Sequence, residues 1–214
     1  MTDTDYPSFP KIPRFNRTIF ITEKIDGTNG LVAIDRKPFG SGADGVEPGV
    51  YVVFDFSELD SSGLPNWEFH IRAGSRNRWL TPSADNAGFS KWVDRNAAEL
   101  TKLGPGRHYG EWYGAGIQRG YGLTEKRFAL FNAARWQDDE ARPECCDVVP
   151  VLAVTAGAFL SETVYDVLAD LVTDGSVLVP GYMQPEGVII FHSAANQFFK
   201  VLIENDNLPK WVAA

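Results

Sequence analysis

A single lysine, Lys24, lies between a run of mostly β-branched and aromatic residues and a turn that contains glycine. Residues 18–22 have the composition of a strand, Asp26-Gly27 is a strong turn signal, and residues 31–34 restart a strand. The pattern predicts a hairpin with Lys24 at the end of its first strand. A lysine pressed against a pocket wall is desolvated, which favours the neutral, nucleophilic amine. The alternative is an ordinary surface lysine beside a hairpin.

Four further short segments follow, and three of them carry one charged residue each. They are residues 109–114, 128–132, 185–190 and 198–201. Together with residues 23–29 they resemble, in order, nucleotidyltransferase motifs I, III, IIIa, IV and V of the covalent superfamily that contains polynucleotide ligases and mRNA capping enzymes. Asn29, five positions after Lys24, makes the first motif more similar to RNA ligases of the type 2 kind than to DNA ligases.

The resemblance implies an α+β fold with antiparallel β-sheets flanked by helices, a nucleotidyltransferase (ATP-grasp-like DNA/RNA ligase) core. The hydrophobic pattern of the sequence agrees with this fold, because several apolar stretches are short, rich in β-forming residues and bounded by turns. These stretches are residues 50–54, 68–71, 108–113, 127–136, 186–192 and 197–203.

Two segments have the spacing of helices. Apolar residues recur at helical intervals between Gly88 and Leu103. Ser161 is a suitable N-cap for a second helix, whose buried face is expected at Val164, Val167, Leu168 and Leu171.

Length and composition favour one soluble globular domain. We expect residues 1–214 to form a single adenylation domain without a C-terminal accessory domain. No run approaches the roughly 20 apolar residues of a membrane helix, and the N-terminus lacks a secretory signal pattern. The expectation is therefore a cytoplasmic protein. The net charge of −8 argues against nucleic-acid binding through bulk electrostatics, so a local basic groove or a protein partner would have to contribute.

The resemblance implies that Lys24 attacks the α-phosphorus of ATP and forms a lysyl-AMP intermediate. A 5′-phosphate end then takes the AMP, and a 3′-hydroxyl end displaces it to seal the strand. The implied activity is that of an ATP-dependent RNA ligase. A DNA ligase core or a GTP-using capping-type guanylyltransferase is the nearest alternative, and a non-catalytic module that binds nucleotides or nucleic-acid ends is an alternative of another class.

Two glutamates are candidates for holding a divalent metal. Glu186 opens a predicted strand, and a hard carboxylate ligand there suits Mg²⁺ or Mn²⁺. The resemblance assigns that metal role to Glu186, and it implies that Glu111 accepts a hydrogen bond from the ribose or assists a metal-bound water. A solvated glutamate at a strand end is the alternative for Glu186.

Further residues of the motifs are implied to bind the nucleotide. Glu23, Ile25 and Asn29 flank the lysine, and Phe131 would stack on adenine, or else belong to the core. Arg76 would bind the ribose or the incoming 5′-phosphate, although Arg78 fits the same pattern.

The fifth motif departs from the family. Lys200 matches its first lysine and is implied to grip the nucleotide phosphates, but Leu202 stands where a second lysine is usual. Lys210 or Arg127 could supply the missing charge. The departure puts activation of the triphosphate in question rather than nucleotide binding.

Overall fold

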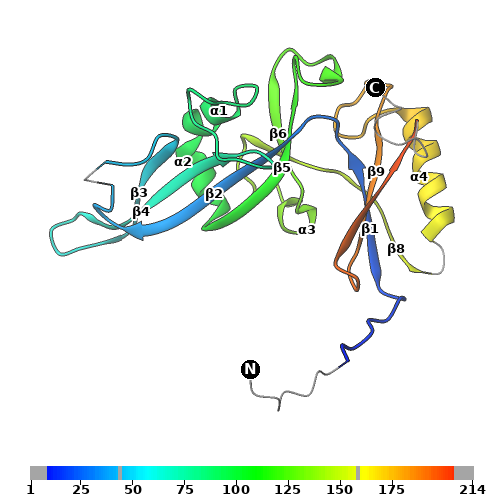
Figure 1. Cartoon of the computed structure of the whole chain (residues 1–214), viewed down its shortest axis with the longest axis horizontal. Coiled ribbons are helices and arrows are strands. Elements are labelled where there is room, and N and C mark those ends of the chain that lie inside the picture. The colour runs from blue at the N-terminus through cyan, green and yellow to red at the C-terminus, as the bar shows by residue number, and fades with distance from the viewer. Residues whose placement is uncertain (1–8, 43–44, 158–159, 205–214) are drawn as a thin grey trace.

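The computed structural model describes residues 9–42, 45–157 and 160–204, which form two β-sheets with helices on their outer faces (Figure 1). The smaller sheet has four antiparallel strands in the order β10-β9-β1-β8. The strands are β1 (Thr18–Lys24), β8 (Val151–Ala156), β9 (Gly187–His192) and β10 (Gln197–Leu202). Its first strand therefore pairs only with strands from the second half of the chain.

The larger sheet has six strands in the order β3-β4-β2-β5-β6-β7. They are β2 (Thr28–Pro38), β3 (Val50–Leu59), β4 (Pro65–Gly74), β5 (Gly106–Gly114), β6 (Lys126–Leu130) and β7 (Cys146–Val148). All pairs are antiparallel except β6 with β7. The expected α+β class with mainly antiparallel sheets is confirmed.

Each sheet has a hydrophobic core on one face. The short helices α1 (Phe89–Arg95) and α2 (Ala97–Leu100) and the 3₁₀ turn η1 (Thr101–Leu103) belong to the larger sheet, where their apolar residues join the core cluster of β2, β4, β5 and β6. The long helix α4 (Leu160–Asp174) covers the smaller sheet through Val164, Val167 and Leu171. The helix α3 (Ala133–Trp136) and the 3₁₀ turn η2 (Gly120–Gly122) lie in connections.

The predicted hairpin at Lys24 is wrong, because β1 and β2 belong to different sheets. The Asp26-Gly27 signal marks a crossing from one sheet to the other, visible in Figure 1 as the blue chain that passes from β1 to β2. A turn signal reports a local change of direction and does not report which strand pairs with which. Residues 25–27 consequently connect the two sheets.

Three smaller expectations also need correction. The helix predicted between Gly88 and Leu103 is broken at Asn96, whose φ of −105° and ψ of 10° are not helical. The strand expected over residues 127–136 ends at Leu130, and the Asn132 side chain then caps α3 by accepting a hydrogen bond from the Arg135 backbone N–H. Helix α4 already includes Leu160, so Ser161 lies inside it rather than at its N-cap.

Candidate active site

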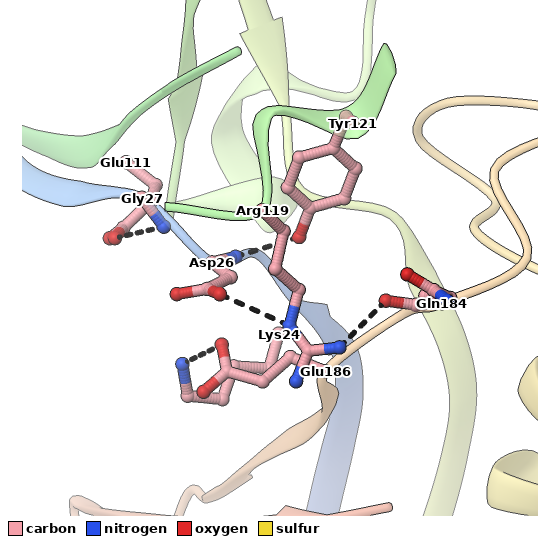
Figure 2. Close-up of polar contacts among 8 residues, drawn as sticks. All are labelled: Lys24, Asp26, Gly27, Glu111, Arg119, Tyr121, Gln184 and Glu186. Carbon is pink, nitrogen blue, oxygen red and sulfur yellow. Dashed lines mark hydrogen bonds and ion pairs between the residues drawn. The ribbon is translucent and has the colours of Figure 1, made fainter. Parts of the chain in front are cut away.

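Lys24 ends β1 and forms an ion pair with Glu186, the residue that precedes β9 (Figure 2). The two strands are in register here, with Lys24 opposite Gly187. The two side chains are 21% and 17% exposed, so the pair is partly screened from water without being sealed from it. The structure therefore brings into contact two motif residues that are 162 positions apart in the sequence.

A glycine makes this pairing possible. Gly187 has a φ of +149°, and a Cβ at this position would lie 2.2 Å from the carbonyl oxygen of Val201 and 2.8 Å from the Cα of Leu202. No side chain fits in that space. Gly187 thus lets the start of β9 pass between Lys24 on one side and Leu202 on the other.

Glu111 of β5 faces the crossing between the sheets. The backbone N–H of Gly27 donates to Glu111 Oε1 over 3.1 Å, and Asn29 is opposite Glu111 in the β2–β5 register. Cross-strand partners share a face of a sheet, so Asn29 and Glu111 lie side by side. The predicted nucleotide-binding residues of motifs I and III are therefore neighbours.

Burial raises the pKa of Glu111 to about 7, from an ordinary 4.5. The positive charge of Lys24 and the hydrogen bond from Gly27 oppose the rise, whereas the carboxylates of Glu186 and Asp26 add to it. Three carboxylates and one amine thus share a small region. A cluster of carboxylates in which one has a strongly shifted pKa is typical of functional sites.

Asp26, two residues after Lys24, is held by the connection between β5 and β6 (Figure 2). Its backbone N–H donates to the Tyr121 hydroxyl over 2.7 Å, and Arg119 Nε donates to Asp26 Oδ2 over 3.1 Å. Arg119 Nη1 also donates to the carbonyl of Gln184 over 3.0 Å. These contacts connect the crossing between the sheets to the segment that enters β9.

Glu23 and Ile25, both predicted to bind nucleotide, have buried side chains on either side of Lys24. The Glu23 carboxylate accepts hydrogen bonds from Ser176 Oγ over 2.6 Å and from the N–H groups of Val177 and Leu178 over 2.9 Å each. Burial raises its pKa, and these hydrogen bonds oppose the rise. Nucleotide contacts by Glu23 or Ile25 would therefore come from the main chain.

The remaining predicted residues are spread around this centre. Phe131 is 40% exposed just after β6, so it is not a core residue, and its stacking on adenine stays a prediction. Arg78 donates to the carbonyls of Ala84 and Asp85, whereas Arg76 makes no hydrogen bond or ion pair with the described residues. Arg76 is therefore the one whose guanidinium is available.

The motif V residues lie on β10, which pairs with β9 on the side away from β1. Lys200 of β10 is exposed and opposite Ile189, two rows of the sheet away from Lys24. Of the two suggested replacements for a second lysine, Arg127 pairs with Glu125 over 2.5 Å, and Lys210 lies outside the described residues. Arg127 thus already has an anionic partner, and a role for Lys210 stays a prediction.

A divalent metal fits this site as an ion shared with a substrate. Within the described residues no group of three or more histidines, cysteines or carboxylates is arranged to cage a metal ion. However, Asp26 and Glu186 both act electrostatically on Glu111, and a cation would relieve that repulsion. Mg²⁺ commonly keeps several waters and uses one or two carboxylates together with phosphates. Glu111 and Glu186 would hold such an ion.

The same fold of two sheets with flanking helices is found in solved structures. A Naegleria gruberi RNA ligase variant with ATP and Mn is 18% identical, with a TM-score of 0.54, and the match covers 89% of this chain and 51% of that one. An archaeal ATP-dependent RNA ligase is 15% identical, with a TM-score of 0.50, covering 90% and 47%. The chain thus spans about half the length of these proteins.

The family model described as RNA ligase matches residues 17–202. The chain therefore belongs to the RNA ligase family, as its motifs predicted. The comparison with curated proteins gave no match. No helix among the described residues has the length and apolar character needed to cross a membrane.

Sequence reasoning missed three residues that shape the site. The sequence indicates Asp26 only as part of a turn, and it gives no site role to Arg119 or Tyr121. Tyr121 and Arg119 reach Asp26 across 95 and 93 positions of sequence. The dense glycines at 114, 116, 120 and 122 were the available signal that this connection folds tightly.

Proposed function

We propose that this protein is an ATP-dependent RNA ligase that joins 3′-hydroxyl and 5′-phosphate ends through a lysyl-AMP intermediate. The observation that carries the proposal is the ion pair of Lys24 with Glu186, next to a third residue, Glu111, whose pKa is raised to about 7. Membership of the RNA ligase family supports RNA as the substrate. DNA ends are the alternative substrate.

In the first step, Lys24 Nζ attacks the α-phosphorus of ATP. A nitrogen–phosphorus bond forms, the bond from that phosphorus to the bridging oxygen breaks, and pyrophosphate leaves with the electron pair. The amine attacks in its neutral form and loses one proton as the nitrogen–phosphorus bond forms, and Glu186, already hydrogen-bonded to Nζ, is the acceptor of that proton closest at hand. A divalent ion, when bound, would offset the negative charge of the phosphates.

In the later steps the AMP moves to the nucleic acid. A 5′-phosphate oxygen attacks the lysyl-AMP phosphorus and frees the lysine, and a 3′-hydroxyl oxygen then attacks the 5′-phosphate and releases AMP. The exposed guanidinium of Arg76 can bind a phosphate with two parallel hydrogen bonds. Phe131 offers an exposed aromatic face for the adenine.

The decisive experiment is covalent labelling. The protein is incubated with Mn²⁺ or Mg²⁺ and with α-labelled ATP or GTP, and the products are separated on a denaturing gel. We expect label from ATP on wild-type protein and none on K24A. K102A is the matched control, because Lys102 is an exposed lysine paired with Glu99 away from the site. Label from GTP alone would replace this proposal with a guanylyltransferase.

Strand joining is tested separately from adduct formation. Nicked duplexes and single strands of RNA and DNA, each with a labelled 5′-phosphate, are incubated with protein, ATP and metal. We expect RNA ends to be sealed faster than DNA ends. Adduct formation without any sealing would support a module that charges itself with AMP but does not join strands.

A further inference from the structure

We infer that Arg119 is a positioning residue for adenylation, which holds Lys24 and Glu186 in the geometry of their ion pair. The inference rests on the proposed function. Arg119 lies in the connection between β5 and β6 and donates to two different segments of the site: Nε to Asp26 Oδ2 over 3.1 Å and Nη1 to the Gln184 carbonyl over 3.0 Å. Figure 2 shows its guanidinium between them.

The two acceptors are placed symmetrically about the reactive pair. Asp26 comes two residues after Lys24, and Gln184 comes two residues before Glu186. One guanidinium therefore fixes the chain that leaves the nucleophile against the chain that leads to its carboxylate partner. A planar guanidinium offers several N–H donors in a fixed arrangement, and an ammonium group lacks this geometry.

The connection that carries Arg119 is itself firmly anchored. Tyr121, two residues on, is only 2% exposed although its φ is +53°, a conformation that packing must enforce in a non-glycine residue. Its ring lies 5.6 Å from that of Tyr113 and 4.6 Å from that of Tyr182, centroid to centroid. Its hydroxyl accepts the Asp26 N–H over 2.7 Å. Arg119 thus extends from a fixed base.

Arg119 also separates the charges of the site. Asp26 and Glu186 both lie near enough to Glu111 to act on it electrostatically. The ion pair with Arg119 gives Asp26 a cation of its own, and the ion pair with Lys24 does the same for Glu186. Without Arg119, the carboxylate of Asp26 would be free to compete for the amine.

The test compares adenylation in a single turnover by wild type, R119A, R119K and R107A. R107A is the matched control, because Arg107 makes a similar ion pair with Asp35, over 2.9 Å, on another part of the larger sheet. The rate constant of adduct formation is measured at saturating ATP, and the Kd for ATP is measured separately on the same samples. Each variant is also checked for its melting temperature.

We expect R119A to lower the rate constant roughly 10- to 100-fold, as a small misplacement of reacting groups does. The Kd for ATP should stay within about threefold, because Arg119 acts through Asp26 and Gln184 and not on the nucleotide. R119K should have an intermediate rate constant, since an ammonium group keeps the positive charge but lacks the planar set of N–H donors. R107A should react like wild type.

Added guanidinium ion decides between positioning and general damage to the fold. Millimolar guanidinium should restore part of the lost rate in R119A and leave R107A unchanged. A wild-type rate in R119A, a weakened Kd that accounts for the whole loss, or a slow R119A that guanidinium cannot rescue would overturn the inference. If wild-type protein forms no adduct, the proposed function fails instead, so the two failures are distinguishable.

Discussion

Leu202 and Lys24 lie in the same row of the smaller sheet, one on each side of Gly187. Residues opposite each other on neighbouring strands present their side chains on the same face, so Leu202 shares the face of the catalytic candidate. The residue where the family usually has a second lysine is thus close to the site, and an apolar side chain stands there. The departure from the family pattern at Leu202 therefore lies in the same row as the proposed nucleophile.

Replacing Leu202 with lysine should strengthen ATP binding. The added cation would face the phosphates at a partly exposed position, where such charge contacts are worth up to about 1 kcal/mol, or about a twofold to fivefold lower apparent KM for ATP. Initial rates of adduct formation against ATP concentration provide the measurement. L202M is the control for loss of leucine packing. An unchanged or higher KM in L202K would show that this row does not face the phosphates.

Replacing Glu23 with alanine should destabilise the fold. The carboxylate is 1% exposed and accepts three hydrogen bonds from residues 176–178. Its loss would leave these buried donors without an acceptor. We expect this to lower the free energy of unfolding by roughly 2 kcal/mol or more. Urea denaturation provides the measurement, and E23Q, which keeps an acceptor, should lose less. Unchanged stability together with lost ATP binding would indicate that the Glu23 side chain binds the nucleotide directly.

Arg76 and Arg78 should respond differently to alanine. Arg78 holds the carbonyls of Ala84 and Asp85, over 2.6 and 3.2 Å, so R78A should lower the melting temperature. R76A should leave the melting temperature unchanged and slow a substrate step by about tenfold or more, as loss of a charged hydrogen bond does. Adenylation and sealing of pre-adenylated RNA are measured for both. The opposite pattern would assign the phosphate-binding role to Arg78.

The raised pKa of Glu111 predicts how stability depends on pH. Its folded-state pKa of about 7 lies above the ordinary 4.5, so between these values the folded protein binds more protons than the unfolded chain. The contribution of Glu111 to stability is therefore most favourable below about pH 4.5 and is lost as the pH rises through about 7. E111Q should melt close to wild type at pH 5 and above it at pH 8, in metal-free buffer. Equal differences at both pH values would contradict this shift.

The sequence motifs predicted the composition of the site better than the arrangement of the chain around it. The motifs identified three candidate site residues, Lys24, Glu111 and Glu186. Each lies within or at the end of a short predicted strand, and the motifs follow one another in the order found in one family. The hairpin at Asp26-Gly27 could not be excluded, because a turn signal is local and the partners of β1 come from far along the chain. Pairing of that kind is set by tertiary packing.

Polar contacts between residues far apart in the sequence could not be predicted from it either. The ion pair of Arg119 with Asp26 joins residues 93 positions apart, and Glu23 meets Ser176 across 153 positions. Neither contact follows from hydrophobic periodicity, which reports only which face of a strand is buried.

The placement of β1 has a consequence for how this protein is made. Its neighbours β8 and β9 begin at Val151 and Gly187, so a ribosome must add more than a hundred residues after Lys24 before that strand has anything to pair with. The larger sheet can assemble earlier, from strands that follow one another closely. An unfinished chain would therefore carry the Lys24 amine without its carboxylate partner until the ribosome has passed Glu186.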